Sequence, residues 1–333
     1  MTDVIGPPPP FDPELAAAMA VVLDQLPKLD ELTVRTNDIQ TIVNAFRDRM
    51  ARALAVDADL TRDGAFTVNE RSVPGPPGAP QADLLICRPN NVSAPCGAIY
   101  YIHGGGMIGG NQYLGVAALQ DIVEELGIAI VSVDYRLAPE HPHPAPVEDC
   151  YAGLLWTVEH AEELGIDRDR IVVSGVSAGG GLAAATALLA RDRGGPALLG
   201  QALLCPMLDD RNDSYSAQQM AGIGLWDRAA NNLGWTALLG DAQGGPDVSP
   251  YAAPARATDL SGLPAAFIDV GSAETFRDEA VDYASRIWQA GGVAELHVWP
   301  GGFHGFAGMV PQAALAQAAG AAPEEWLRRI FAA

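Results

Sequence analysis

The sequence predicts an α/β protein in which helices cover both faces of a mainly parallel β-sheet. Three observations support this prediction. Short apolar runs alternate with longer helical stretches from about residue 97 onward. The runs are almost uniformly apolar, as expected for strands that are buried on both sides. Hydrophobic residues make up 49% of the 333 residues, so the chain has enough apolar surface for a large core and lacks the composition of a disordered protein.

The N-terminal segment precedes this alternation. Its first ten residues are proline-rich and are expected to form an extended arm. A helix is predicted to follow, with Asp12 as its N-cap and Pro13 in its first turn. Its apolar positions are Leu15, Met19, Val22, Leu23 and Leu26. A second amphipathic helix is predicted around residues 37–54, and strands are predicted at 66–73 and 83–88, on either side of a turn-rich segment.

The alternating part of the chain supplies the remaining elements. Strands are predicted at 98–102, 128–133, 171–173, 202–204, 266–270 and 294–298, and helices at 116–126, 147–163, 179–193, 277–290 and 322–332. Residues 207–245 do not fit, because they hold two polar helical pieces dotted with aromatic residues, at 217–222 and 226–239. An insertion of this length is expected to cover something, such as a lid.

Composition excludes several classes of function. With 20 Lys+Arg against 41 Asp+Glu the net charge is −21, and such a surface repels nucleic acid and anionic lipid. The single lysine, Lys28, nearly excludes mechanisms in which a lysine assists the nucleophile. The four cysteines show no C-x-x-C spacing, so neither a metal site nor a redox pair is expected. The N-terminus does not read as a signal peptide and no apolar run is long enough to span a membrane, so a cytoplasmic protein without integral membrane contact is expected.

The segment 175–179 reads Gly-Val-Ser-Ala-Gly, a G-x-S-x-G pattern between a predicted strand and a predicted helix. In this context the pattern is typical of a nucleophile elbow, which lifts the Ser177 hydroxyl out of the sheet on a strained turn. Gly175 and Gly179 must then be small, because neighbouring backbone passes close to them. The alternative is a tight turn that only packs glycines.

An upstream loop offers partners for such a nucleophile. His103 is followed by Gly104, Gly105 and Gly106 directly after the strand at 98–102. Bare glycine amides can donate to a developing oxyanion, together with the amide of Ala178 after the nucleophile. A rival interpretation is a dinucleotide-binding pattern, Gly104-x-Gly106-x-x-Gly109 with Glu124 or Glu125 downstream. It ranks lower, because no helix is expected to open directly at this loop.

A serine nucleophile needs a base and an acid. His304 stands in a glycine-rich loop after the last strand, where a base can face Ser177. His103 is expected to hold the glycine loop instead, and the other histidines have structural interpretations: His141, His143, His160 and His297. The acid should follow a strand between Ser177 and His304. Glu274 is the preferred acid, with Asp269 and Asp278 as alternatives, and Asp278 and Glu279 are more simply explained as charges at a helix N-terminus.

Taken together, these motifs resemble the hormone-sensitive-lipase-like esterases, bacterial family IV, of the α/β-hydrolase superfamily. The matching stretches occur in the family's order and cover roughly residues 80 to 330: 103–106, 133–140, 175–180, 271–279 and 302–306. The resemblance implies an α/β-hydrolase fold, with an eight-stranded, mostly parallel sheet and a helical cap. The cap would combine N-terminal helices in residues 1–50 with the insertion at about 207–245 of a catalytic domain spanning 51–333.

The resemblance also implies roles for single residues. Ser177 falls on the nucleophile, His304 on the general base and acid, and Glu274 on the acid. The oxyanion hole falls on Gly104, Gly105 and Ala178, with Gly106 as loop support. Two positions depart from the family. Most relatives have Asp followed by Pro-Leu where this chain has Glu274-Thr275-Phe276, so the loop must retract slightly, and Val176 stands where relatives often have Asp or Thr.

The resulting hypothesis is a serine carboxylesterase that acts on small-molecule esters with short to medium acyl chains and needs no cofactor. Short chains are favoured because the predicted cap is small; its candidate wall residues are Phe11, Met220, Leu225 and Trp226. A non-catalytic receptor on the same fold is a second hypothesis, although such receptors have typically lost the base, which is present here. An amidase or peptidase is a third. Relatives often form homodimers, so a homodimer is kept as a candidate assembly.

Overall fold

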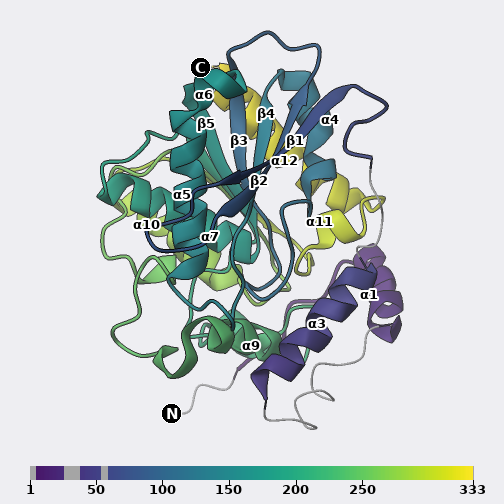
Figure 1. Ribbon diagram of the computed structural model, residues 1–333. Coiled ribbons are helices and arrows are strands. Elements are labelled where there is room, and N and C mark those ends of the chain that lie inside the picture. The colour runs from purple at the N-terminus through teal and green to yellow at the C-terminus, as the bar shows by residue number, and fades with distance from the viewer. Residues whose placement is uncertain (1–4, 26–37, 54–58, 333) are drawn as a thin grey trace.

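A computed structural model describes residues 5–25, 38–53 and 59–332 of the chain. Its centre is one eight-stranded sheet with the order β1-β2-β4-β3-β5-β6-β7-β8 (Figure 1). Strand β2 pairs antiparallel with both of its neighbours, and the pairs from β4 through β3 to β8 are all parallel. The strands are β1 (Phe66–Val73), β2 (Ala82–Pro89), β3 (Cys96–Ile102), β4 (Ala129–Asp134), β5 (Ile166–Val176), β6 (Gly200–Leu204), β7 (Ala266–Gly271) and β8 (Ala294–Trp299). The predicted eight-stranded, mostly parallel sheet is confirmed.

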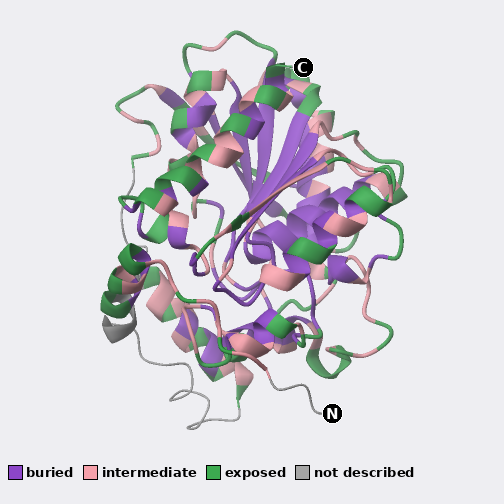
Figure 2. Ribbon diagram, turned by 180° about the vertical axis from the view of Figure 1, so that it is seen from behind, coloured by how far each residue is buried: buried purple, intermediate pink, exposed green. Residues whose placement is uncertain are grey.

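Helices cover both faces of the sheet. One face is covered by α5 (Ala145–Glu159), α6 (Ala161–Leu164), α7 (Ala178–Asp192) and α10 (Arg277–Gln289), and the other by α4 (Val116–Leu126), α11 (Phe306–Met309) and α12 (Ala314–Ala332). Each face has its own cluster of buried apolar side chains. The inner strands β3, β4, β6 and β7 are almost entirely buried, whereas the edge strands β1 and β8 are not (Figure 2). This burial explains why the sequences of the inner strands are almost uniformly apolar rather than alternating.

A further group of helices lies beyond the carboxyl ends of the strands (Figure 1). It contains α1 (Pro13–Gln25), α3 (Ile39–Ala53), α8 (Tyr215–Gln219) and α9 (Arg228–Leu239), with short 3₁₀ turns at η1 (Gly240–Ala242) and η2 (Pro254–Arg256). Leu15 and Met19 of α1 pack against Phe303 and Phe306, in the loop that follows β8 and in α11. The N-terminal helices and the 207–245 insertion therefore gather at the edge of the sheet where parallel α/β proteins bind ligands.

Local signals predicted most of these elements correctly. Strand β1 has the predicted bounds, and Asp12 caps α1 by accepting from the amides of Glu14 and Leu15. The side chains of Val22 and Leu23 and the residues Leu26 and Lys28 lie outside what the structure describes.

Three boundaries were wrong. Helix α12 begins at Ala314 rather than 322, because the alanine-rich stretch before Pro323 is strongly helix-forming and the proline is accommodated inside the helix. Strand β5 begins at Ile166 rather than 171, because its charged residues 167–170 mask the extension in the sequence. The helix predicted at 147–163 is interrupted at His160, which separates α5 from α6. No helix among the described residues is long and apolar enough to cross a membrane.

Candidate active site

Ser177 occupies the sharp turn between β5 and α7. Its backbone has φ 60° and ψ −122°, a conformation that is strained for a residue with a side chain. A Cβ atom on Gly175 would collide with the carbonyl of Gly179, and one on Gly179 would collide with the carbonyl of Ile102. Both positions therefore have to be glycine for the turn to close. The predicted elbow geometry is present.

The loops after β5, β7 and β8 bring three functional side chains into a chain of hydrogen bonds. The Ser177 hydroxyl lies 2.9 Å from Nε2 of His304. Nδ1 of His304 lies 3.1 Å from Oε1 of Glu274. Glu274 is 2% exposed, and its other oxygen accepts a 3.0 Å bond from the amide of Gly271. Because Glu274 can only accept, the partners place the imidazole proton on Nδ1 and leave Nε2 free to accept from Ser177.

The other two candidate acids lie elsewhere. Asp269 accepts bonds from the amide of Cys205 and from Nε1 of Trp299, at 3.2 and 3.1 Å. Asp278 accepts a 2.7 Å bond from the amide of Ser216. Neither carboxylate is hydrogen-bonded to His304, so the geometry favours Glu274.

Asp278 and Glu279 lie in the first turn of α10, as predicted, but neither of them caps the helix. Asp278 binds the start of α8 instead, and the buried Glu279 accepts a 2.7 Å bond from the amide of Leu208. Burial raises the pKa of Glu279 well above its ordinary value. Both residues tie the start of α10 to the inserted segment, a tertiary role that no local pattern indicates.

The glycine loop, residues 104–106, lies beside Ser177 because β3 and β5 are neighbours in the sheet. A Cβ on Gly104 would come within 3.4 Å of the Ser177 Cβ, and Gly105 has φ 115°, which only glycine adopts without strain. Among the described residues, the amides of Gly104, Gly105, Gly106 and Ala178 have no intramolecular acceptor. These amides are therefore available to an oxygen bound next to Ser177.

The dinucleotide interpretation of this loop is wrong. Gly106 and Gly109 lie in a tight turn, and the next helix, α4, begins only at Val116. Glu125, one of the two acids of this interpretation, forms a salt bridge with Arg328 of α12. The glycine motif therefore does not open a helix of its own, as a dinucleotide-binding fingerprint requires.

Comparisons with known proteins agree with this geometry. A family model described as alpha/beta hydrolase fold matches residues 99–308. The chain belongs to the α/β-hydrolase family. Carboxylesterase NlhH of Mycobacterium tuberculosis is 40% identical over 261 residues, which are 77% of this chain and 81% of the relative. Esterase LipI of the same organism is 33% identical over 301 residues, 87% of this chain and 92% of the relative. The solved structure of a bacterial heroin esterase superposes with a TM-score of 0.87 at 40% identity, over 96% of this chain and 98% of that one.

In this α/β-hydrolase, His103 holds the glycine loop, as the sequence suggested. Its Nδ1 lies 2.8 Å from the carbonyl oxygen of Gly104, and its ring stacks on Tyr135 at 4.2 Å. The Tyr135 hydroxyl donates a 2.9 Å bond to the His103 carbonyl. His103 is fully buried, and burial lowers its pKa from 6.5 to about 4. The neutral ring can therefore donate from Nδ1 at physiological pH.

Because the pKa of His103 is lowered, we predict that the folded protein loses stability as the pH falls below neutral. The unfolded chain binds a proton at this side chain below pH 6.5 and the folded chain only near pH 4, so the stabilisation from the neutral ring is lost as the pH falls between these values. We expect the stability difference between the wild type and His103→Asn, which keeps a donor for Gly104, to shrink by about 3 kcal/mol from pH 7.5 to 4. Urea unfolding at several pH values measures the free energy of unfolding of both proteins, and His160→Asn serves as the control. Parallel stability curves for wild type and His103→Asn would contradict the prediction.

Trp226, a candidate wall residue, lies where three segments of the hydrolase meet. Its ring lies 5.9 Å from that of Phe46 and 6.4 Å from that of His304. A Cβ on Gly106 would collide with the indole. The hydroxyl of Thr275, next to Glu274, donates a 2.7 Å bond to the Trp226 carbonyl. The indole is therefore held next to both the glycine loop and His304.

The other candidate wall residues lie away from this space or have a packing role. Phe11 and Leu225 pack in the cluster around α1 and Phe303, and Met220 is buried at the end of α8. One neighbour of these side chains was not anticipated: the thiol of Cys205, directly after β6, lies close to Glu274 and His304.

Proposed function

We propose that this α/β-hydrolase is a serine carboxylesterase that acts on small-molecule esters. The observation that carries the proposal is the continuous chain from Ser177 to His304 to Glu274, with bonds of 2.9 and 3.1 Å, next to a set of unengaged amides. The names of the relatives point to the same reaction class, since NlhH is named a carboxylesterase and LipI an esterase.

In the proposed mechanism, Ser177 attacks the ester carbonyl while Nε2 of His304 takes the hydroxyl proton. Glu274 keeps the proton of His304 on Nδ1 and stabilises the imidazolium as it forms. Amides among Gly104, Gly105 and Ala178 donate to the oxyanion, each contributing about 3 kcal/mol to transition-state stabilisation. His304 then protonates the leaving alcohol, and a water activated by the same nitrogen hydrolyses the acyl-enzyme.

We further propose that residues 1–50 and about 207–245 act as a cap over this site, on a catalytic domain spanning 51–333. The evidence for this cap is Trp226, because its indole lies against α3, the glycine loop and His304. A large ring so close to the nucleophile leaves limited room for an acyl chain. A preference for short chains follows.

The direct test is turnover of p-nitrophenyl acetate by the purified full-length chain, with the corresponding p-nitroanilide as the amidase comparison. Ester turnover with little anilide cleavage is expected. Absence of ester turnover would refute the proposal and leave a ligand receptor on the same fold, whereas faster anilide cleavage would indicate an amidase.

Replacing Trp226 with leucine should relax the chain-length preference. Removing the indole frees volume above Gly106, and each buried methylene of a longer acyl chain contributes roughly 1–3 kcal/mol to binding. We expect the ratio of kcat/KM for p-nitrophenyl octanoate to that for the acetate to rise at least about tenfold. The matched control is Trp288→Leu, which removes a half-exposed indole on α10. An unchanged ratio in Trp226→Leu would place the acyl chain elsewhere.

A further inference from the structure

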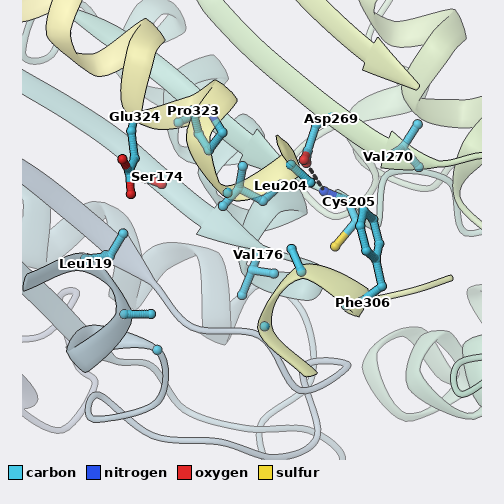
Figure 3. Close-up of a pocket in the computed structure, with 18 of the residues that line it drawn as sticks. Leu119, Ser174, Val176, Leu204, Cys205, Asp269, Val270, Phe306, Pro323 and Glu324 are labelled. Atoms are coloured by element: carbon cyan, nitrogen blue, oxygen red, sulfur yellow. Dashed lines mark hydrogen bonds between the residues drawn. The ribbon is translucent and has the colours of Figure 1, made fainter. Parts of the chain in front are cut away.

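A cavity of about 340 Å³ lies behind the proposed triad, on the face of the sheet covered by α4 and α12. Its walls are mostly apolar and come from strands β3, β5, β6 and β7 and from helices α4, α11 and α12. Ser174, Leu119 and Glu324 line one end, and Cys205 and Phe306 lie at the other (Figure 3). Glu274 and Gly305, the neighbour of His304, also line the cavity. The cavity therefore reaches Glu274 of the proposed machinery and the residue next to His304.

Cys205 is held in a fixed position at this end. It follows β6 with φ 37°, and its amide donates to the buried carboxylate of Asp269. Its sulfur, a carboxylate oxygen of Glu274 and a ring nitrogen of His304 all lie within 4.8 Å of one another. No other set of three such ligand groups occurs among the residues that the structure describes.

These three groups have the chemistry of a site for a soft divalent cation. Thiolate, imidazole and carboxylate are the usual protein ligands of Zn²⁺, at about 2.0 to 2.3 Å, which places neighbouring ligand atoms roughly 3.5 Å apart. The nitrogen and oxygen of the His304–Glu274 pair already lie at 3.1 Å. The sulfur lies within 4.8 Å of both atoms and would have to approach them by up to about 1.3 Å. A water molecule in the cavity can complete four-fold coordination.

The charge around Cys205 also favours a cation. The carboxylate of Glu274 belongs to the same cluster as the Cys205 sulfur, and the carboxylate of Asp269 accepts a bond from the Cys205 amide. These carboxylates oppose a free thiolate but attract a divalent ion. Binding is then an exchange, in which the ion enters, the sulfur–metal bond forms and the thiol proton leaves to solvent.

We propose that Cys205, Glu274 and His304 form a binding site for a thiophilic divalent cation such as Zn²⁺ or Cd²⁺, and that this binding and catalysis exclude each other. A metal bound at Nδ1 of His304 displaces the proton that Glu274 accepts, and one bound at Nε2 displaces the Ser177 hydroxyl. A metal on Nδ1 makes Nε2 less basic and removes the support of Glu274, and a metal on Nε2 blocks that nitrogen, so His304 no longer acts as an efficient base. The binding is independent of the proposed function; only its inhibitory effect rests on it.

Binding is tested first without activity, in the full-length Ser177→Ala protein in a buffer free of thiols and chelators. Titration with Cd²⁺ should produce the ultraviolet thiolate-to-cadmium charge-transfer band, saturating at one equivalent. The band should be absent from Ser177→Ala/Cys205→Ala and retained in Ser177→Ala/Cys87→Ala, which removes a buried cysteine of β2 instead. A band that persists without Cys205, or no band at all, would overturn the proposal.

Inhibition is tested in the active enzyme. Zn²⁺ should lower p-nitrophenyl acetate hydrolysis, and EDTA should restore it. The half-inhibiting Zn²⁺ concentration should rise at least about tenfold in Cys205→Ala and stay unchanged in Cys87→Ala. Equal sensitivity of Cys205→Ala and wild type would overturn the inhibitory role. A protein that hydrolyses no ester but still gives the Cys205-dependent band would refute the esterase proposal while leaving the metal site in place.

Discussion

Replacing Ser177 with alanine is expected to lower kcat for p-nitrophenyl acetate by up to about 10⁶-fold, with the fold retained. The hydroxyl is the only nucleophile within hydrogen-bond distance of the His304 Nε2 among the described residues. Its removal leaves the amides of the glycine loop and Ala178 in place. Some rate enhancement over water should therefore remain, on the order of 10³-fold.

Two variants distinguish loss of chemistry from loss of structure. Ser174→Ala removes a buried serine of β5, three residues before Ser177, and should keep nearly full activity. Ser177→Gly should be as inactive as Ser177→Ala yet more stable by about 1 kcal/mol, because glycine relieves the strain at φ 60°. Unchanged turnover in Ser177→Ala would refute the assignment of the nucleophile.

Sequence patterns predicted correctly those elements that depend on only a few neighbouring residues. The elbow at 175–179 and the N-cap at Asp12 each follow from a few neighbouring residues, and the structure has both. The inner strands, such as β3 and β4, could be located because burial on both faces makes them almost uniformly apolar. Helix α12 shows the limit of this reasoning, because a proline inside an alanine-rich helix is decided by the packing of the whole segment.

The site was predictable only in part, since its parts meet through tertiary structure. His304 could be selected by its place after the last strand, whereas three nearby carboxylates competed for the acid. Only the fold separates Glu274, which turns toward His304, from Asp269, which turns toward Trp299. The contact of Cys205 with the triad depends on the neighbouring positions of β6 and β7 in the sheet, which no sequence spacing encodes.

Replacing Glu274 with glutamine should lower kcat by about 10³- to 10⁴-fold while preserving side-chain volume. An amide can donate to Nδ1, which would move the imidazole proton to Nε2 and leave no acceptor for the Ser177 hydroxyl. Even an amide that accepts from Nδ1 carries no charge to stabilise the imidazolium. Glu274→Asp keeps the charge but shortens the reach across the 3.1 Å bond, so its activity should be intermediate.

The comparison that decides the acid is Glu274→Gln against Asp269→Asn and Asp278→Asn, each measured as kcat on p-nitrophenyl acetate with its unfolding midpoint. Asp269→Asn should alter stability more than kcat, because Asp269 accepts from the Cys205 amide and the Trp299 indole and makes no bond to His304. Asp278→Asn should mainly loosen the attachment of α8, whose Ser216 amide it holds. If Glu274→Gln kept near-normal turnover while either asparagine variant lost it, the acid would have to be reassigned, and with it the proton positions assigned to His304.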